Sequence, residues 1–132
     1  MIVITIASIQ LTVSHHIISH DTYTFVTITI GNPGGLLDQA VEISSYLVPP
    51  NSNIVSSKSK SGPEIIYRSA NNIQPIIPAG MKLVVLVNKG SASAAEIVSG
   101  AIQDLDAGVV VGSSRTYGKG NLRGCMYMIH QL

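Results

Sequence analysis

Two short segments carry the residue types of nucleophilic catalysis. In the first, an apolar run ends at Asn88 and small residues lead through Ser93 directly into a helical pattern. A serine at a helix start lies among main-chain N–H groups that stabilise a developing oxyanion. In the second, Lys119 stands between two glycines. A lysine enclosed by apolar groups loses its charge more readily, and the neutral amine can accept the proton of a serine hydroxyl.

Each segment also has a reading that needs no catalysis. Ser93 and Glu96 have the spacing of a capping box, in which a serine and a glutamate satisfy the first N–H groups of a helix. Lys119 fits a solvated lysine in a glycine turn. Taken alone, each segment favours this structural role, and the choice stays open.

A third segment, Gly31-Asn32-Pro33-Gly34-Gly35, follows a predicted strand. Adjacent glycines at a strand end can present their N–H groups to an anion, although glycine-rich turns between a strand and a helix are also common.

Other chemically capable residues are weaker candidates. His15, His16 and His20 form no good metal site, because neighbouring residues of a strand point to opposite faces. Asp104 lies eleven residues after Ser93, about 16 Å along one helix, so it has at most a structural or positioning role. Cys125 is expected to serve packing.

The elements around these segments alternate between strand and helix. Period-two alternation predicts a strand at 22–30, and two short strands at 54–57 and 64–67 flank a polar turn. Apolar runs predict strands buried on both faces at 82–88 and 109–111, and a last strand is expected at 122–129. Helical periodicity covers 36–48 and 94–105. This order predicts an α/β fold with crossover connections.

Composition sets the outer limits. The chain has 132 residues, which suits one domain, and 45% are hydrophobic while only 11% are charged. A net charge of +1 gives no whole-chain electrostatic case for binding nucleic acid or an anionic membrane. The single cysteine excludes an internal disulfide. Residues 1–13 are apolar but too short to span a bilayer, and we interpret them as a strand or a poor signal-like segment.

Four motifs in the same order resemble the C-terminal processing peptidases, or tail-specific proteases, which are Ser-Lys serine endopeptidases. They are Asn-Pro-Gly-Gly-Leu-Leu at 32–37, Val-Val-Leu-Val-Asn-x-Gly-Ser-Ala-Ser-Ala-x-Glu-Ile-Val at 84–98, Gln-Asp at 103–104 and Arg-Thr-Tyr-Gly-Lys-Gly at 115–120. The resemblance implies that Ser93 is the nucleophile and Lys119 the general base. It also implies an oxyanion hole made by the N–H of Ala94 with that of Gly34 or Gly35.

The same resemblance implies an incomplete crotonase-like (ClpP/crotonase-type) α/β protease core. It implies protein or peptide substrates cut near their C-termini, no metal or cofactor, and a place outside the cytoplasm, in the bacterial periplasm or the thylakoid lumen. We expect a divergent segment at 1–29, the catalytic core at 30–124 and a divergent tail at 125–132.

The chain departs from the family pattern at several points. Ile28-Thr29-Ile30 stands where the family often has Asp-Leu-Arg, and Arg123 stands where a glutamine usually orients the lysine. The PDZ domain that normally precedes the core and the sheet that normally follows it do not match any part of the chain. Two hypotheses follow: an active Ser-Lys peptidase, or a catalytically incompetent fragment that serves as a non-enzymatic or peptide-binding module.

Overall fold

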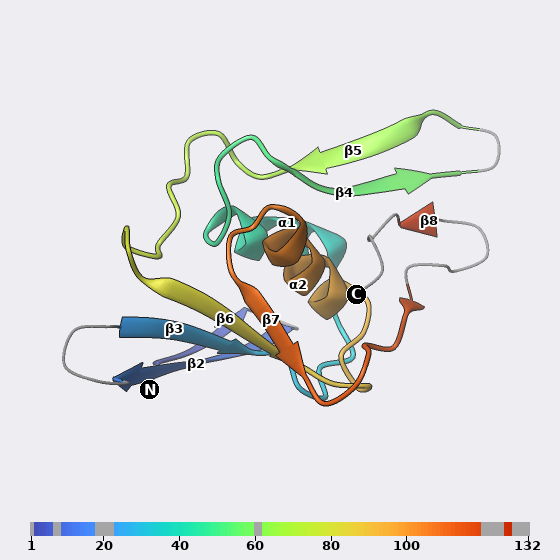
Figure 1. The fold of residues 1–132 in the computed structure, drawn as a ribbon. Helices are drawn as coiled ribbons and strands as arrows, with labels where there is room; N and C mark the ends of the chain where they lie inside the picture. Colours follow the sequence, from blue (N-terminus) through green and yellow to red (C-terminus); the bar gives the residue numbers. More distant parts are fainter. Residues whose placement is uncertain (1, 7–8, 18–22, 60–61, 120–125, 128–132) are drawn as a thin grey trace.

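The described residues form three layers, with two helices packed between two β-sheets (Figure 1). The computed structural model describes residues 2–6, 9–17, 23–59, 62–119 and 126–127. This mixed arrangement of helices and strands confirms the α/β class predicted from the sequence. Neither helix in these ranges is long and apolar enough to cross a membrane.

The larger sheet has five strands in the order β1-β2-β3-β6-β7. Its strands are β1 (Ile2–Ile6), β2 (Ile9–Ile17), β3 (Tyr23–Ile28), β6 (Lys82–Val87) and β7 (Val109–Gly112). The first three are antiparallel neighbours, whereas β3, β6 and β7 run parallel. The strand predicted at 22–30 is thus confirmed as β3. The apolar N-terminal segment forms the β1–β2 hairpin rather than one strand, with Ile4 opposite Leu11.

The expectation that the apolar strands are buried on both faces is wrong. In β6, Leu83, Val85 and Val87 are buried, but the residues between them are only half-buried. In β7, Val109 is 60% exposed and Val111 48%. The reason is that the helices cover one face of the sheet and β7 lies at its edge.

The helices supply most of the core. They are α1 (Leu37–Ser45) and α2 (Ala94–Asp104), and they pack against each other. The main cluster of buried apolar side chains joins both helices to β4 and β6. The first helix ends three residues before the predicted limit. Residues 46–48 form a turn ahead of Pro49, because proline disfavours helical backbone in the residue before it.

The smaller sheet covers the other side of the helices. It contains β4 (Asn53–Lys58), β5 (Glu64–Arg68) and β8 (Met126–Tyr127) in the order β5-β4-β8. The hairpin predicted at 54–67 is confirmed as β4 and β5, paired antiparallel. Of the strand expected at 122–129, the structure describes β8, and the rest lies outside the described residues.

Candidate active site

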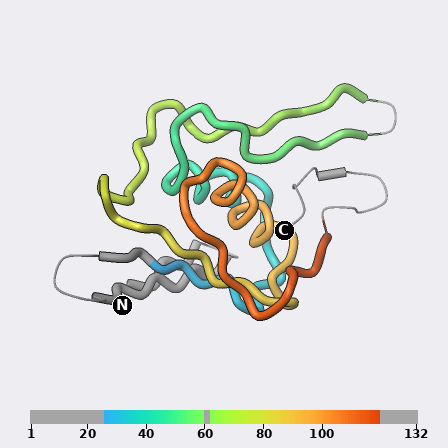
Figure 2. The backbone as a smooth tube through the Cα atoms, viewed as in Figure 1, coloured from blue at the N-terminus to red at the C-terminus, as the bar shows by residue number. Residues whose placement is uncertain are grey.

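Three loops meet at the carboxyl ends of the parallel strands. Residues 29–36 follow β3, residues 88–93 follow β6, and residues 113–119 follow β7. Figure 2 shows these loops gathered at one end of the larger sheet. In open sheets with parallel strands, ligands bind at this edge. The three segments singled out from the sequence therefore share one end of the molecule.

The first two loops are tied together by side chains. Oδ1 of Asn88 accepts hydrogen bonds from the main-chain N–H of Gly31 and of Gly90, each at 2.9 Å. The buried Ser91 hydroxyl donates to the carbonyl oxygen of Thr29 at 2.6 Å and accepts from the Asn88 N–H at 3.1 Å. These contacts fix the turn after β3 against the turn after β6.

Ser93 has a strained backbone at the point where the second loop enters α2. Its φ is 55° and its ψ is −120°, a region that residues other than glycine rarely occupy. Such a conformation costs about 1–3 kcal/mol and persists only where the surroundings impose it, most often at functional sites. Here the N–H of Ala92 donates to the carbonyl oxygen of Asn32 at 2.9 Å, and the N–H of Ser93 donates to Glu96.

The buried carboxylate of Glu96 connects the serine turn with the lysine loop. Its Oε2 accepts the N–H of Ser93 at 2.8 Å and that of Lys119 at 3.1 Å, while Oε1 accepts the N–H of Gly118 at 2.6 Å. The side chain is only 3% exposed, so these three donors replace water around the charge. Because one oxygen accepts both N–H groups, the main-chain nitrogens of Ser93 and Lys119 lie within about 6 Å of each other.

The capping box predicted at Ser93 and Glu96 is confirmed, and it does more than cap the helix. The N–H of Glu96 donates to the main-chain carbonyl oxygen of Ser93 at 2.9 Å, which closes the first turn. Sequence reasoning assigned Glu96 to capping alone. It missed the bonds from residues 22 and 23 positions further along, which the Ser-x-x-Glu spacing does not indicate.

Lys119 is half-buried, and its Nζ lies 5.4 Å from the centre of the Tyr117 ring. This is a cation–π distance. Tyr117 is 67% exposed. The lysine side chain is therefore neither fully solvated nor fully enclosed by apolar groups, the two environments that the sequence left as alternatives. A main-chain bond from the N–H of Tyr117 to the carbonyl oxygen of Ser91, 2.9 Å long, holds this loop beside the serine turn.

Gly34 lies directly against the serine. A Cβ added at Gly34 would come within 2.6 Å of the Ser93 Cβ and 2.8 Å of the Ala94 nitrogen. Its φ of 101° also suits glycine. The Gly34 N–H donates to Oδ1 of Asn32 at 2.8 Å, so of the two candidate glycines Gly34 already has an acceptor for its N–H.

Asp104 is not brought to this site. Asp104 is exposed at the far end of α2, about 15 Å along the helix from its first residue. His15 and His16 are neighbours in β2. Arg123, Cys125 and His20 lie outside the described residues. In the described ranges, no group of three or more His, Cys, Asp or Glu residues could hold a metal ion.

The structure thus brings a strained serine at the start of a helix and a lysine loop together on one carboxylate. Comparison with known proteins gives the class: residues 30–128 match the model of peptidase family S41. The chain belongs to peptidase family S41.

Similar sequences come from staphylococci. A probable CtpA-like serine protease of Staphylococcus saprophyticus is 40% identical over 89 residues, which are 67% of this chain and 18% of that protein. A protein of the same description from Staphylococcus aureus is 37% identical over 89 residues, again 67% of this chain and 17% of the relative. The chain thus spans less than a fifth of the length of these relatives.

Two solved structures share the fold. The photosystem II D1 C-terminal processing protease has a TM-score of 0.62 and 32% identity, over 72% of this chain and 23% of that one. A lipoprotein from Streptococcus agalactiae has a TM-score of 0.57 over 80% of this chain and 50% of that one. At 14% identity, the lipoprotein bears on the fold alone.

Proposed function

We propose that this chain carries the catalytic core of a serine endopeptidase that cuts protein substrates near their C-termini. Membership of family S41 supports the reaction class, and similarity to the D1 C-terminal processing protease supports the position of the cut. The observation that carries the proposal is the Glu96 carboxylate, which holds the main chains of Ser93 and Lys119 on one oxygen.

In this reaction the Ser93 Oγ attacks the carbonyl carbon of the scissile peptide bond while neutral Lys119 takes the hydroxyl proton at Nζ. The oxygen of the tetrahedral intermediate becomes negative, and the N–H groups of Ala94 and Gly35 stabilise it, with Gly34 shaping the space. The lysine then gives its proton to the leaving amine, and the peptide C–N bond breaks. Water hydrolyses the acyl-enzyme by the same proton transfers, so the serine and lysine supply every proton transfer and the chain needs no metal or cofactor.

The Tyr117 ring adds a step to this sequence. A cation–π contact stabilises the ammonium, whereas the base must be an uncharged amine. Lys119 therefore turns away from the ring before it accepts the serine proton. Rotation of an exposed side chain takes picoseconds to nanoseconds.

The catalytic core in this proposal is residues 30–124 on a crotonase-like framework. The parallel strands β3, β6 and β7 and the helices between them support that framework. The segment 1–29 contributes strands to the same sheet, since β3 pairs with β6, and 125–132 follows as a tail.

Labelling of the serine tests the proposal. A fluorophosphonate probe should modify Ser93 of the native chain, identified by mass spectrometry, and the native chain should hydrolyse unstructured peptides. Ser93→Ala should abolish both, and Lys119→Ala should reduce labelling by at least a hundredfold because the base is lost. Ser59→Ala, an exposed serine before the β4–β5 turn, is the matched control. Labelling of native protein at another serine contradicts the assignment.

The second candidate is a peptide-binding module without hydrolysis. The observation that favours it is the position of Lys119 over Tyr117, where the ammonium is stabilised. Such a chain would bind peptides at the three loops and leave the probe unreacted. The labelling experiment separates the two functions directly.

A further inference from the structure

The loops around Ser93 carry positive charge that the proposed reaction does not use. The segments 29–36, 88–93 and 113–119 contain three basic residues, Lys89, Arg115 and Lys119, and no acidic residue. Lys89 and Arg115 are exposed. The Glu96 carboxylate beneath them is buried and already accepts three N–H groups. Along the chain, the first carboxylate after the loop 29–36 is the exposed Asp38, in the first turn of α1.

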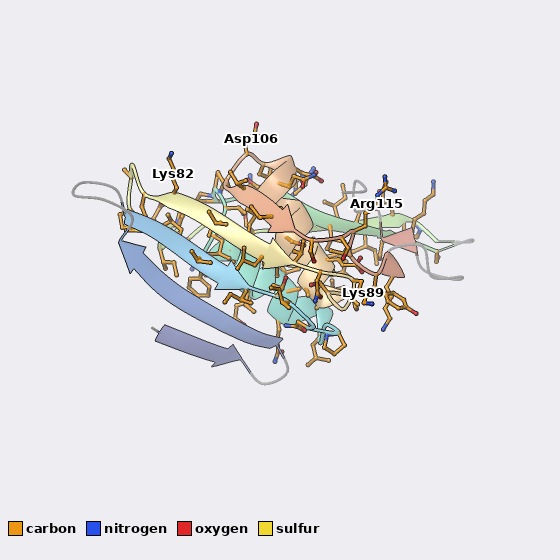
Figure 3. All side chains as sticks on the ribbon, turned by 60° about the horizontal axis from the view of Figure 1, so that its bottom comes forward. Lys82, Lys89, Asp106 and Arg115 are labelled. Atoms are coloured by element: carbon orange, nitrogen blue, oxygen red, sulfur yellow. The ribbon has the colours of Figure 1, made fainter. Side chains whose placement is uncertain are left out.

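The two exposed cations lie on neighbouring loops. The N–H of Lys89 donates to Oγ of Ser114, the residue before Arg115, at 3.0 Å. Figure 3 shows both basic residues beyond the carboxyl ends of β6 and β7, while Lys82 and Asp106 lie at the opposite end of the sheet. The cations are thus at the same end as the candidate catalytic residues.

Chain length bounds the distance of each cation from the candidate catalytic residue on its own loop. Lys89 precedes Ser93 by four residues, and Arg115 precedes Lys119 by four. Four residues of chain span at most about 14 Å. A substrate in extended conformation across Ser93 covers the same distance with four residues on one side of the cut bond.

We propose that Lys89 and Arg115 select substrates that carry a carboxylate within about four residues of the cleaved bond. This inference rests on the proposed function, because it takes the peptide to lie across Ser93. The carboxylate is either the free C-terminus of the substrate or an Asp or Glu side chain. Arginine binds carboxylates through two parallel N–H groups, and lysine adds a point charge. Every protein substrate has such a carboxylate at its free C-terminus, so a cut close to the C-terminus meets this requirement.

Binding to the Ser93→Ala protein tests the inference without relying on turnover. Three fluorescent hexapeptides of one sequence would be compared by anisotropy: one with a free C-terminus, one amidated, and one amidated with an Asp in place of Asn near its end. At low salt we expect the free acid or the Asp peptide to bind about four- to twenty-fivefold tighter than the neutral amide, since each of the two exposed cations contributes about two- to fivefold. In 0.5 M salt the preference should fall toward unity. The peptide that shows the preference identifies the source of the carboxylate.

Charge-removing variants locate the preference. Lys89→Gln and Arg115→Gln, each in the Ser93→Ala background, should each lower the acid-to-amide ratio by about two- to fivefold. Lys82→Gln is the matched control, because Lys82 is an exposed lysine at the start of β6, whereas Lys89 follows the other end of that strand. An equal affinity for acid and amide peptides, an absence of binding, or an equal loss in Lys82→Gln would overturn the inference.

Hydrolysis by the native chain is read separately. If the chain prefers acid peptides but neither reacts with the probe nor cleaves peptides, the proposed function is refuted and the carboxylate selectivity stands. If the chain cleaves acid and amide peptides with equal kcat/KM, the proposed function stands and the carboxylate selectivity is refuted.

Discussion

Replacing Glu96 with glutamine isolates the carboxylate that joins the serine turn to the lysine loop. Glutamine keeps nearly the same volume and one carbonyl oxygen but turns the second acceptor into an NH2 donor. With the carbonyl oxygen in the place of Oε2, the amide keeps the bonds from Ser93 and Lys119 and sets its NH2 against the N–H of Gly118. The opposite orientation loses the two other bonds.

The cost follows from the burial of the site. A hydrogen bond to a charged acceptor contributes about 1.5–3 kcal/mol, and an unsatisfied buried N–H costs about 1–3 kcal/mol. Since Glu96 is only 3% exposed, solvent cannot satisfy the displaced donor. We expect Glu96→Gln to lower the free energy of unfolding by about 2–3 kcal/mol. We expect Glu96→Ala, which removes all three bonds, to lower it by about 3–5 kcal/mol.

Urea unfolding followed by circular dichroism measures the free energy, and fluorophosphonate labelling below the transition measures the reactivity of Ser93. Labelling of Glu96→Gln should slow by at least tenfold, because the amide NH2 faces the N–H of Gly118 and pushes the lysine loop away from the serine turn. The matched control is Glu42→Gln, an exposed glutamate on α1, which should change neither quantity. If Glu96→Gln unfolds at the same urea concentration and labels as fast as the native chain, the bridging role is refuted.

Three further substitutions probe the loops. Gly34→Ala places a Cβ 2.6 Å from that of Ser93 and should cost about 2–4 kcal/mol of stability and most of the labelling. Gly80→Ala, also at positive φ but with nothing within 4 Å, should cost only about 1 kcal/mol, and equal losses would remove the clash as the cause. Asn88→Ala leaves two N–H groups without their acceptor and should lower the free energy of unfolding by about 1–3 kcal/mol, as measured by urea unfolding. An unchanged urea midpoint would contradict this prediction. Tyr117→Leu removes a contact of about 0.5–1 kcal/mol to the lysine ammonium and should raise the rate of probe labelling two- to fivefold. Tyr117→Phe keeps the ring and should label at the rate of the native chain. Equal labelling rates in the two variants would contradict this role of the ring.

Local patterns predicted most of the secondary structure. The alternation before Gly31 marked β3, and the apolar stripe after Ser93 marked α2, because side chains two or about 3.6 residues apart share a face. The hairpin of β4 and β5 followed from two apolar runs around a polar turn. The exposure of β7 was not predicted. An apolar run looks the same whether a helix covers both faces of its strand or only one.

The candidate site divides in the same way. The sequence placed Ser93 at a helix start beside glycine turns, since small residues and capping signals act over a few positions. It did not predict the strained φ of Ser93, the bond of Gly34 to Asn32, or the ring beside Lys119.

By itself, the amino-acid sequence determined the order of strands and helices, the reactive groups at their ends and the likeness to tail-specific proteases. Only the tertiary structure decided which turns meet. The Ser91 hydroxyl binds a carbonyl 62 residues away, and the Glu96 carboxylate binds N–H groups 22 and 23 residues away. Periodicity and capping are short-range effects. Hydrogen bonds between distant turns depend instead on how the parallel strands bring their carboxyl ends to one edge of the sheet.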